Sequence, residues 1–148
     1  MAIVAFSAKN FEGKWKTEWF PKTASVAIVK GTPVEWAAGF VKQATTTAGA
    51  SDTPFAGIYN GPTIASTDAD YAANTLIPVL VPDSPNAKVQ MTVSTGTLTT
   101  AMAGLSYDID ANSSVTVSTT TNEAVTCVRF ISATEGMFVL TTVSSPAA

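Results

Sequence analysis

Few residues of this chain have side chains suited to catalysis or to metal binding. The sequence contains no histidine and a single cysteine, Cys127. Histidine is the usual general base near neutral pH and the commonest metal ligand in proteins. An enzyme without it must use carboxylates, lysine or tyrosine for proton transfer. The acidic residues are therefore the first place to look for a reactive centre.

Two pairs of aspartates stand out by their spacing. Asp108 and Asp110 flank one isoleucine, so on a strand or turn both carboxylates lie on the same side, where they suit a hard cation such as Ca²⁺. No further oxygen donors follow at fixed offsets, and we interpret the pair as a solvated turn. Asp68 and Asp70 are explained by the start of a short helix, where the helix dipole favours carboxylates.

The sequence also lacks the short motifs of common catalytic sites. No glycine-rich phosphate loop follows a strand, and neither a Gly-x-Ser-x-Gly elbow nor an aspartic protease motif is present. Cys127 lies in an alternating strand pattern, and we expect it to be buried as a small apolar side chain. We therefore predict a protein that is not an enzyme and has no catalytic residues, no cofactor and no metal.

The composition indicates a β-rich domain whose surface suits contact with other protein. Its 13 serines and 23 threonines alternate with Val, Ile and Leu, as in strands with one exposed face. Only 13% of the residues are charged, against about 25% in soluble domains. Few ions would need to be desolvated when such a surface is covered. The net charge of −3 argues against a nucleic acid partner.

Short apolar runs separated by Gly, Pro and Asn turns predict a mainly β fold. We expect a single antiparallel β-sandwich or small β-barrel over residues 23–148, with a hairpin turn at Ala38-Gly39 and one short helix over residues 67–74. One further helical turn is expected between Gly96 and Gly104. The predicted strands cover residues 25–30, 34–36, 40–44, 55–59, 76–81, 87–93, 106–109, 114–117, 124–132 and 137–143. The predicted core comprises Ile28, Val34, Ile58, Leu80, Val89, Met91, Val93, Val117, Val128, Phe130 and Val139.

The first 22 residues differ from the rest in being aromatic and basic. They hold five of the 13 aromatic residues of the chain, and four lysines against two glutamates. Phe11, Trp15 and Trp19 are spaced to share one helical face, but Gly13 and Pro21 favour a short or irregular segment. Two interpretations stay open: the rings cover the domain's own core, or residues 1–22 form an N-terminal arm that anchors on a partner. The segment does not read as a signal peptide, and no apolar run approaches the length of a membrane span.

From residue 55 onward the order of motifs resembles that of a known group of proteins. A Phe-Ala-Gly-Ile-Tyr strand is followed by Thr-Asp-Ala-Asp-Tyr-Ala-Ala-Asn-Thr and by Ile-Pro-Val-Leu-Val-Pro. Then come Gly-Thr-Leu-Thr-Thr-Ala-Met-Ala-Gly with Tyr107-Asp108, and a Val-Arg-Phe-Ile-Ser strand with Thr-Glu-Gly. This pattern, over about two thirds of the chain, resembles the head decoration (auxiliary or cement-type) proteins of tailed bacteriophages.

The resemblance implies a virion structural protein that binds the outside of the capsid and decorates or stabilises the lattice of the major capsid protein. It also implies a homo-oligomer, with a trimer favoured, made in the host cytoplasm and located on the capsid exterior. Such proteins commonly reach neighbouring subunits with an N-terminal arm, which makes the aromatic and basic residues of the first segment the expected partner contacts: Phe11, Lys14, Trp15, Lys16, Trp19 and Phe20.

A second function class is compatible with the same composition. A Thr-rich β-sandwich with exposed aromatic rings is also typical of carbohydrate-binding or fibre-type modules, in which Trp15, Trp19 or Trp36 would stack on a sugar. In neither case do we expect a membrane partner.

Overall fold

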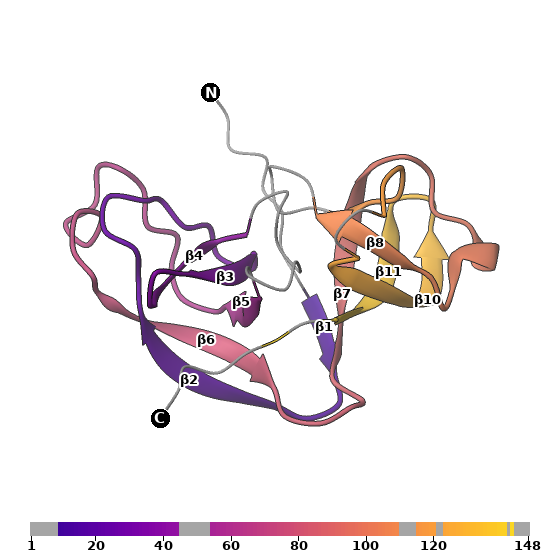
Figure 1. Ribbon diagram of the computed structural model, residues 1–148, viewed down its shortest axis with the longest axis horizontal. Coiled ribbons are helices and arrows are strands. Elements are labelled where there is room, and N and C mark those ends of the chain that lie inside the picture. Colours follow the sequence, from indigo (N-terminus) through magenta and orange to yellow (C-terminus); the bar gives the residue numbers. More distant parts are fainter. Residues whose placement is uncertain (1–8, 45–53, 110–114, 121–122, 142, 144–148) are drawn as a thin grey trace.

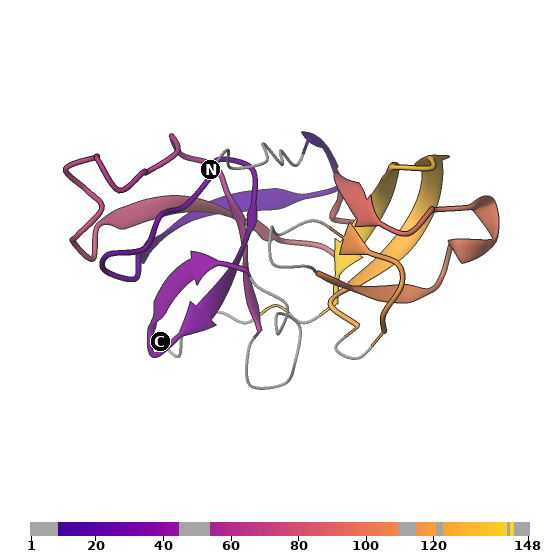
Figure 2. The same ribbon diagram turned by 90° about the horizontal axis from the view of Figure 1, so that it is seen from above.

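The computed structural model describes residues 9–44, 54–109, 115–120, 123–141 and 143, and is mainly β (Figure 1). This part of the chain contains eleven strands and one 3₁₀ turn, η1 (Thr100–Met102). The strands form two groups that lie side by side along the long axis of the molecule in both views (Figures 1 and 2).

The first group is a small barrel with one extra strand. Its order is β1 (Lys9–Glu12), β7 (Lys88–Thr95), β11 (Glu135–Leu140), β10 (Val125–Ser132), β8 (Ser106–Ile109) and β9 (Val115–Thr116). A parallel pairing of β9 with the end of β7 closes five of these strands into a ring. The extra strand β1 pairs with the beginning of β7, around Lys88 and Gln90.

The second group is an antiparallel sheet of five strands. Its order is β2 (Trp15–Pro21), β6 (Leu76–Pro82), β5 (Phe55–Tyr59), β3 (Pro33–Ala37) and β4 (Phe40–Gln43). An isolated parallel bridge between Lys22 and Val41 connects the two outer strands, so the sheet is curled back on itself. The β3–β4 hairpin turns through Ala38 and Gly39, both with positive φ (53° and 87°), as a two-residue turn requires.

Two apolar clusters fill the molecule, and β5 contributes to both. Phe55 and Ile58 belong to the cluster of the barrel, which also includes Val89, Met91 and Phe138. Ala56 and Tyr59 of the same strand belong to the cluster inside the curled sheet, together with others: Phe20, Ile28, Val34, Val41, Ile64, Ile77, Val79 and Val81. All five residues of β5 are buried, because both faces of the strand are covered. A register shift against β3, between Val34 and Glu35, lets Phe55 and Ile58 share one face although they are three residues apart.

Two connections between the groups run side by side (Figure 1). Residues 13–14 lead from β1 to β2, and residues 83–87 lead from β6 to β7. The backbone N–H of Asp83 donates to the Lys14 carbonyl at 2.8 Å, and the Lys14 N–H donates to the Ser84 hydroxyl at 3.2 Å. At Gly13, where φ is +77°, a Cβ atom would overlap the Asn86 carbonyl. Glycine permits this close approach of the two connections.

Most of the predicted strands are confirmed, and the core prediction is partly confirmed. Six of the predicted core residues are buried: Ile28, Val34, Ile58, Val89, Met91 and Val93. Leu80, Val117, Phe130 and Val139 are partly buried. The prediction that Val128 is buried is wrong, because a register shift in β10 between Cys127 and Arg129 leaves this side chain 41% exposed. The expected strand over residues 25–30 is reduced to an isolated bridge between Ile28 and Ile64.

The predicted helix over residues 67–74 is also wrong. Residues 66–73 form consecutive turns and bends, in which the Asp68 carboxylate accepts the Ala65 N–H at 2.7 Å instead of capping a helix. The helical turn expected between Gly96 and Gly104 is present as η1. No helix in the described part of the chain is long and apolar enough to cross a membrane.

The segment expected to form an arm is described from residue 9 onward. Residues 9–12 form β1 and residues 15–21 form β2, and each strand is paired within a sheet. Residues 1–8 of the expected arm lie outside the described residues.

The register of β7 is tested by placing a charge at one of its fully buried positions. Met91 is fully buried, so Met91→Asp should lower the free energy of unfolding by about 3–5 kcal/mol, because an unpaired carboxylate is desolvated. Thr95→Asp is the control, since Thr95 is exposed at the end of the same strand. Urea denaturation of both variants measures the difference. Equal stability of Met91→Asp and the parent would show that the register is wrong.

The close approach of the two connections is tested by a matched pair of glycine substitutions. Gly13 and Gly39 both have positive φ, but a Cβ at Gly39 meets nothing within 4 Å. Gly39→Ala should cost about 1–2 kcal/mol for the left-handed backbone alone. Gly13→Ala should cost about 1–3 kcal/mol more, because the methyl group also displaces the Asn86 carbonyl. Similar unfolding free energies for both variants would contradict this contact.

Candidate functional site

Two of the expected contact residues, Phe11 and Trp15, lie against the core of the barrel. Both are partly buried and pack on the first apolar cluster. Their rings meet edge to face, with centroids 5.1 Å apart. The Trp15 indole N–H donates to the Glu12 carbonyl at 2.8 Å, which fixes the ring beside the turn that joins β1 and β2. These two rings therefore stabilise the fold.

Phe20 also points inward, but into the other cluster. It is 5% exposed and its ring centroid lies 4.8 Å from that of Trp36. Trp15 and Phe20 are an odd number of residues apart on one strand, so they face opposite sides of β2. The helical spacing of Phe11, Trp15 and Trp19 is thus without structural meaning, because two strands separated by Gly13 carry the three rings.

The remaining three expected contact residues are at the surface. The Lys14 and Lys16 side chains are 74% and 47% exposed, and both lie near Asp83, at 3.5 Å and 3.9 Å between charged atoms. Trp19 is 61% exposed. It stands opposite Pro78 in the β2–β6 ladder, on the same strand face as Trp15 but beyond the reach of the barrel.

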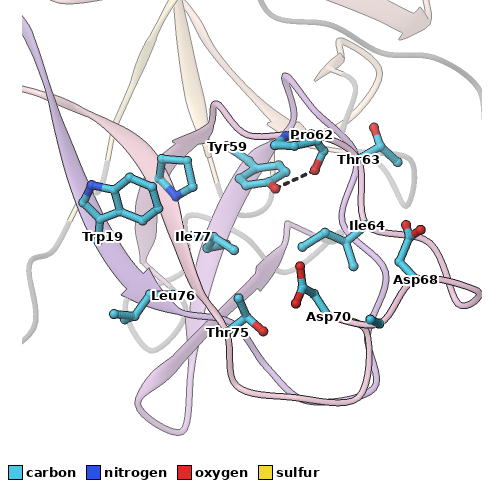
Figure 3. A pocket seen from close by; sticks show the side chains of 12 residues that line it. Trp19, Tyr59, Pro62, Thr63, Ile64, Asp68, Asp70, Thr75, Leu76 and Ile77 are labelled. Atoms are coloured by element: carbon cyan, nitrogen blue, oxygen red, sulfur yellow. Dashed lines mark hydrogen bonds between the residues drawn. The ribbon is translucent and has the colours of Figure 1, made fainter.

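Trp19 borders a pocket of about 440 Å³ at the outer end of the second group (Figure 3). Strands β2, β5 and β6 and the segment of residues 62–75 provide its walls. The lining residues are Trp19, Tyr59, Pro62, Thr63, Ile64, Asp68, Ala69, Asp70, Thr75, Leu76, Ile77 and Pro78. In Figure 3, Trp19 and Leu76 lie on one side and Asp68 and Asp70 on the other. The volume falls within the range of small-ligand pockets.

Hydrogen bonds hold the wall formed by residues 62–75 in place. The Tyr59 hydroxyl donates to the Pro62 carbonyl at 2.6 Å, as Figure 3 shows. The backbone N–H of Ile28 donates to the Ile64 carbonyl, and the Ile64 N–H donates back to Ile28. Asp68 accepts the Ala65 N–H. The wall is therefore held by hydrogen bonds within the segment itself, to Ile28 and to Tyr59 of β5.

A fully buried lysine anchors the far end of the same wall. The Lys22 ammonium donates to three carbonyl oxygens, those of Thr23 at 2.7 Å, Val26 at 2.9 Å and Tyr71 at 2.8 Å. An ammonium has three N–H donors, and all three are used here. The Lys22 nitrogen also lies 5.6 Å from the centroid of the Tyr71 ring. Sequence reasoning missed this role, because an isolated lysine between a proline and a threonine carries no signal of burial.

The charge of Asp70 acts on the groups beneath the pocket. Burial lowers the pKa of Lys22, and the Asp70 carboxylate opposes that shift. Burial raises the pKa of Tyr59, and the same carboxylate raises it further. Asp70 thus lies close enough to both groups to stabilise the ammonium form of Lys22 and the neutral form of Tyr59.

The acidic pair considered as a cation site is not a solvated turn. Asp108 is 5% exposed and accepts hydrogen bonds from the Thr119 hydroxyl at 2.7 Å and from the Glu123 N–H at 2.9 Å. Our interpretation of a solvated turn is therefore wrong for Asp108, which holds the loop after β9. Asp110 lies outside the described residues. Within the described ranges, no group of three or more Cys, Asp or Glu residues is arranged to hold a metal ion.

Cys127 is fully buried, as expected. Burial raises the pKa of its thiol, and a backbone hydrogen bond from Arg129 opposes the shift. A buried thiol with a raised pKa is a poor nucleophile. The pocket beside Trp19 is therefore the better candidate for a functional site.

Comparison of the chain with protein-family models, with curated proteins and with solved structures finds no match in any of the three.

The different roles of two tryptophans on one strand can be measured directly. Trp15→Ala should lower the free energy of unfolding by about 3 kcal/mol, because it removes a ring packed on the barrel core. Trp19→Ala should change it by less than about 0.5 kcal/mol, because the ring is mostly exposed. Urea denaturation of the two single variants compares them under the same conditions. If Trp19→Ala proves the more destabilising, the assignment of the two rings is reversed.

Proposed function

We propose that this protein is a virion structural protein that binds the outside of a phage capsid and decorates or stabilises the lattice of the major capsid protein. The resemblance of the chain from residue 55 onward to head decoration proteins suggests this role. The observation that carries the proposal is an exposed aromatic and aliphatic patch, Trp19 with Leu76, on a well-packed β scaffold.

Trp19 and Leu76 are suited to contact with a partner protein. They are 61% and 59% exposed, on the neighbouring strands β2 and β6. A large exposed apolar pair beside a pocket is typical of an interaction surface. Tryptophan is an efficient anchor, because it offers a large contact area with few rotamers to restrict. The low charge content of the chain favours the same role, since little desolvation of ions opposes contact.

Two exposed lysines near the start of β2 add an electrostatic component. Lys14 and Lys16 precede Trp19 on the β2 side of the molecule, where Asp83 neutralises part of their charge. Their contribution is to steer the approach to an acidic capsid surface. Assembly into a small oligomer, with a trimer favoured, would multiply weak contacts through effective concentration. In this role the protein is made in the host cytoplasm and resides on the capsid exterior.

A second candidate function is binding of a carbohydrate. The observation that favours it is the exposed indole of Trp19 at a pocket that also contains the hydroxyl-bearing residues Thr63 and Thr75. Trp36 is less suited, because its ring packs against Phe20. Binding to a glycan array, set against co-sedimentation with capsids, discriminates the two functions.

The proposal is tested by adding purified protein to capsids that lack it. We expect regular decoration by electron microscopy, and an affinity loss on the order of 30-fold for Trp19→Ala, as for an interface hot spot. Val128→Ala is the matched control, because Val128 is also an exposed apolar residue but lies on the barrel.

Two outcomes would contradict different parts of the proposal, the capsid function and the role of Trp19 in it. Failure of the parent protein to decorate capsids would overturn the capsid function. Full decoration by Trp19→Ala would leave the function standing and exclude Trp19 as the contact.

A further inference from the structure

We propose that the pocket beside Trp19 receives a lysine or arginine side chain of the protein on which this chain docks. The inference rests on the proposed function, because it supplies the chemistry of that contact. It concerns a pocket in which an aromatic ring faces two carboxylates across an apolar floor.

The shape of the pocket suits a long side chain with a charged end. Ile64 and Ile77 lie between the two sides, and both are largely buried (Figure 3). Trp19 and Leu76 offer exposed apolar surface on one side, and Asp68 and Asp70 stand on the other. Lysine and arginine place their methylene groups along apolar surface and keep the charged head in a polar region. A segment crossing Trp19 can thus direct a basic side chain toward the carboxylates.

The two carboxylates are available for such a head group. Both aspartates are exposed, and the ion pairs among the described residues involve Glu12, Glu35, Asp83 and Glu135, with neither Asp68 nor Asp70 among them. The nearby cation, Lys22, has all three N–H groups directed to backbone carbonyls. Lys22 therefore acts on Asp70 only through space, and neither pocket carboxylate has an ion-pair partner among the described residues.

This charge decides between classes of occupant. An anionic group would be repelled by both carboxylates. A neutral sugar could donate hydroxyl hydrogen bonds to them but would leave their charge uncompensated. A lysine or arginine head compensates it, and the Trp19 ring adds a cation–π contribution. The charge complementarity thus favours a basic side chain over a saccharide.

The first experiment uses small probes and needs no capsid. We would titrate N-acetyl-arginine methylamide and N-acetyl-lysine methylamide into labelled protein, following the Trp19 indole N–H and the Ile64 and Ile77 methyl groups by NMR. We expect saturable shifts with a dissociation constant in the millimolar range, as fits one ion pair and one cation–π contact. N-acetyl-citrulline methylamide, which is neutral and of similar shape, should give little shift.

Single substitutions identify the carboxylates responsible. Asp68→Asn and Asp70→Asn should each weaken probe binding several-fold, and Asp68→Asn retains an oxygen that can accept the Ala65 N–H. Glu123→Gln is the matched control, because it removes one exposed negative charge on the barrel. Added salt should weaken binding to the parent protein as well.

The outcomes separate this inference from the proposed function. Equal shifts with arginine and citrulline probes, or no shift with any basic probe, would overturn the inference. Saturable shifts with chitotriose or maltotriose alone would overturn it in favour of a sugar site. If the parent protein decorates capsids and both aspartate variants bind them with unchanged affinity, the inference about the pocket is wrong and the capsid function stands. Basic-probe binding without capsid decoration would keep the pocket chemistry and exclude that capsid as the partner.

Discussion

The structure depends on the burial of β5 from both sides. Phe55 and Ile58 face the barrel, whereas Ala56 and Tyr59 face the interior of the curled sheet. One five-residue strand therefore links two cores, each of which would expose part of an apolar face without the other group. Val143, which packs on both clusters, reinforces the same junction. Because burial of apolar area is the dominant favourable contribution to folding, the two groups are stabilised together.

The pocket follows from that arrangement, since Tyr59 is both the end of β5 and part of the pocket lining. Its hydroxyl holds Pro62, and the buried Lys22 ammonium holds the Tyr71 carbonyl at the other end of the same wall. Irregular segments need such partners, because they cannot satisfy their carbonyl groups with each other as a sheet does. A desolvated charge is costly, but here three carbonyl oxygens and the field of Asp70 offset the cost. The wall is thereby fixed in shape without regular secondary structure.

Sequence reasoning reached the strands and missed the features that depend on distant partners. The alternation around Val89 and Met91 predicts β7, and the Ala38-Gly39 turn predicts the hairpin, since both signals are local. The strand pattern around Val128 predicts a buried side chain. The side chain is exposed instead, because pairing with β11 shifts the register of β10, and the local sequence gives no sign of that shift. The pocket could not be predicted from the sequence for the same reason, because it also depends on strand pairing. Trp19 is visible as an aromatic residue, but only the pairing of β2 with β6 separates it from Trp15 and places it beside the loop that carries Asp70.

The strand β2 carries two aromatic residues that pack on the cores and one that is exposed. Trp15 is close to the barrel and is covered by it, Phe20 faces the curled sheet, and Trp19 lies on the outer face beyond the barrel. A residue in that position gains little from the fold, so retaining a large apolar ring there costs solubility without adding stability. The two carboxylates across the pocket are exposed and form no ion pair within the described residues. A partner that covers the ring and pairs with the carboxylates would use both features in one contact, which is why we propose recognition at this end of the molecule.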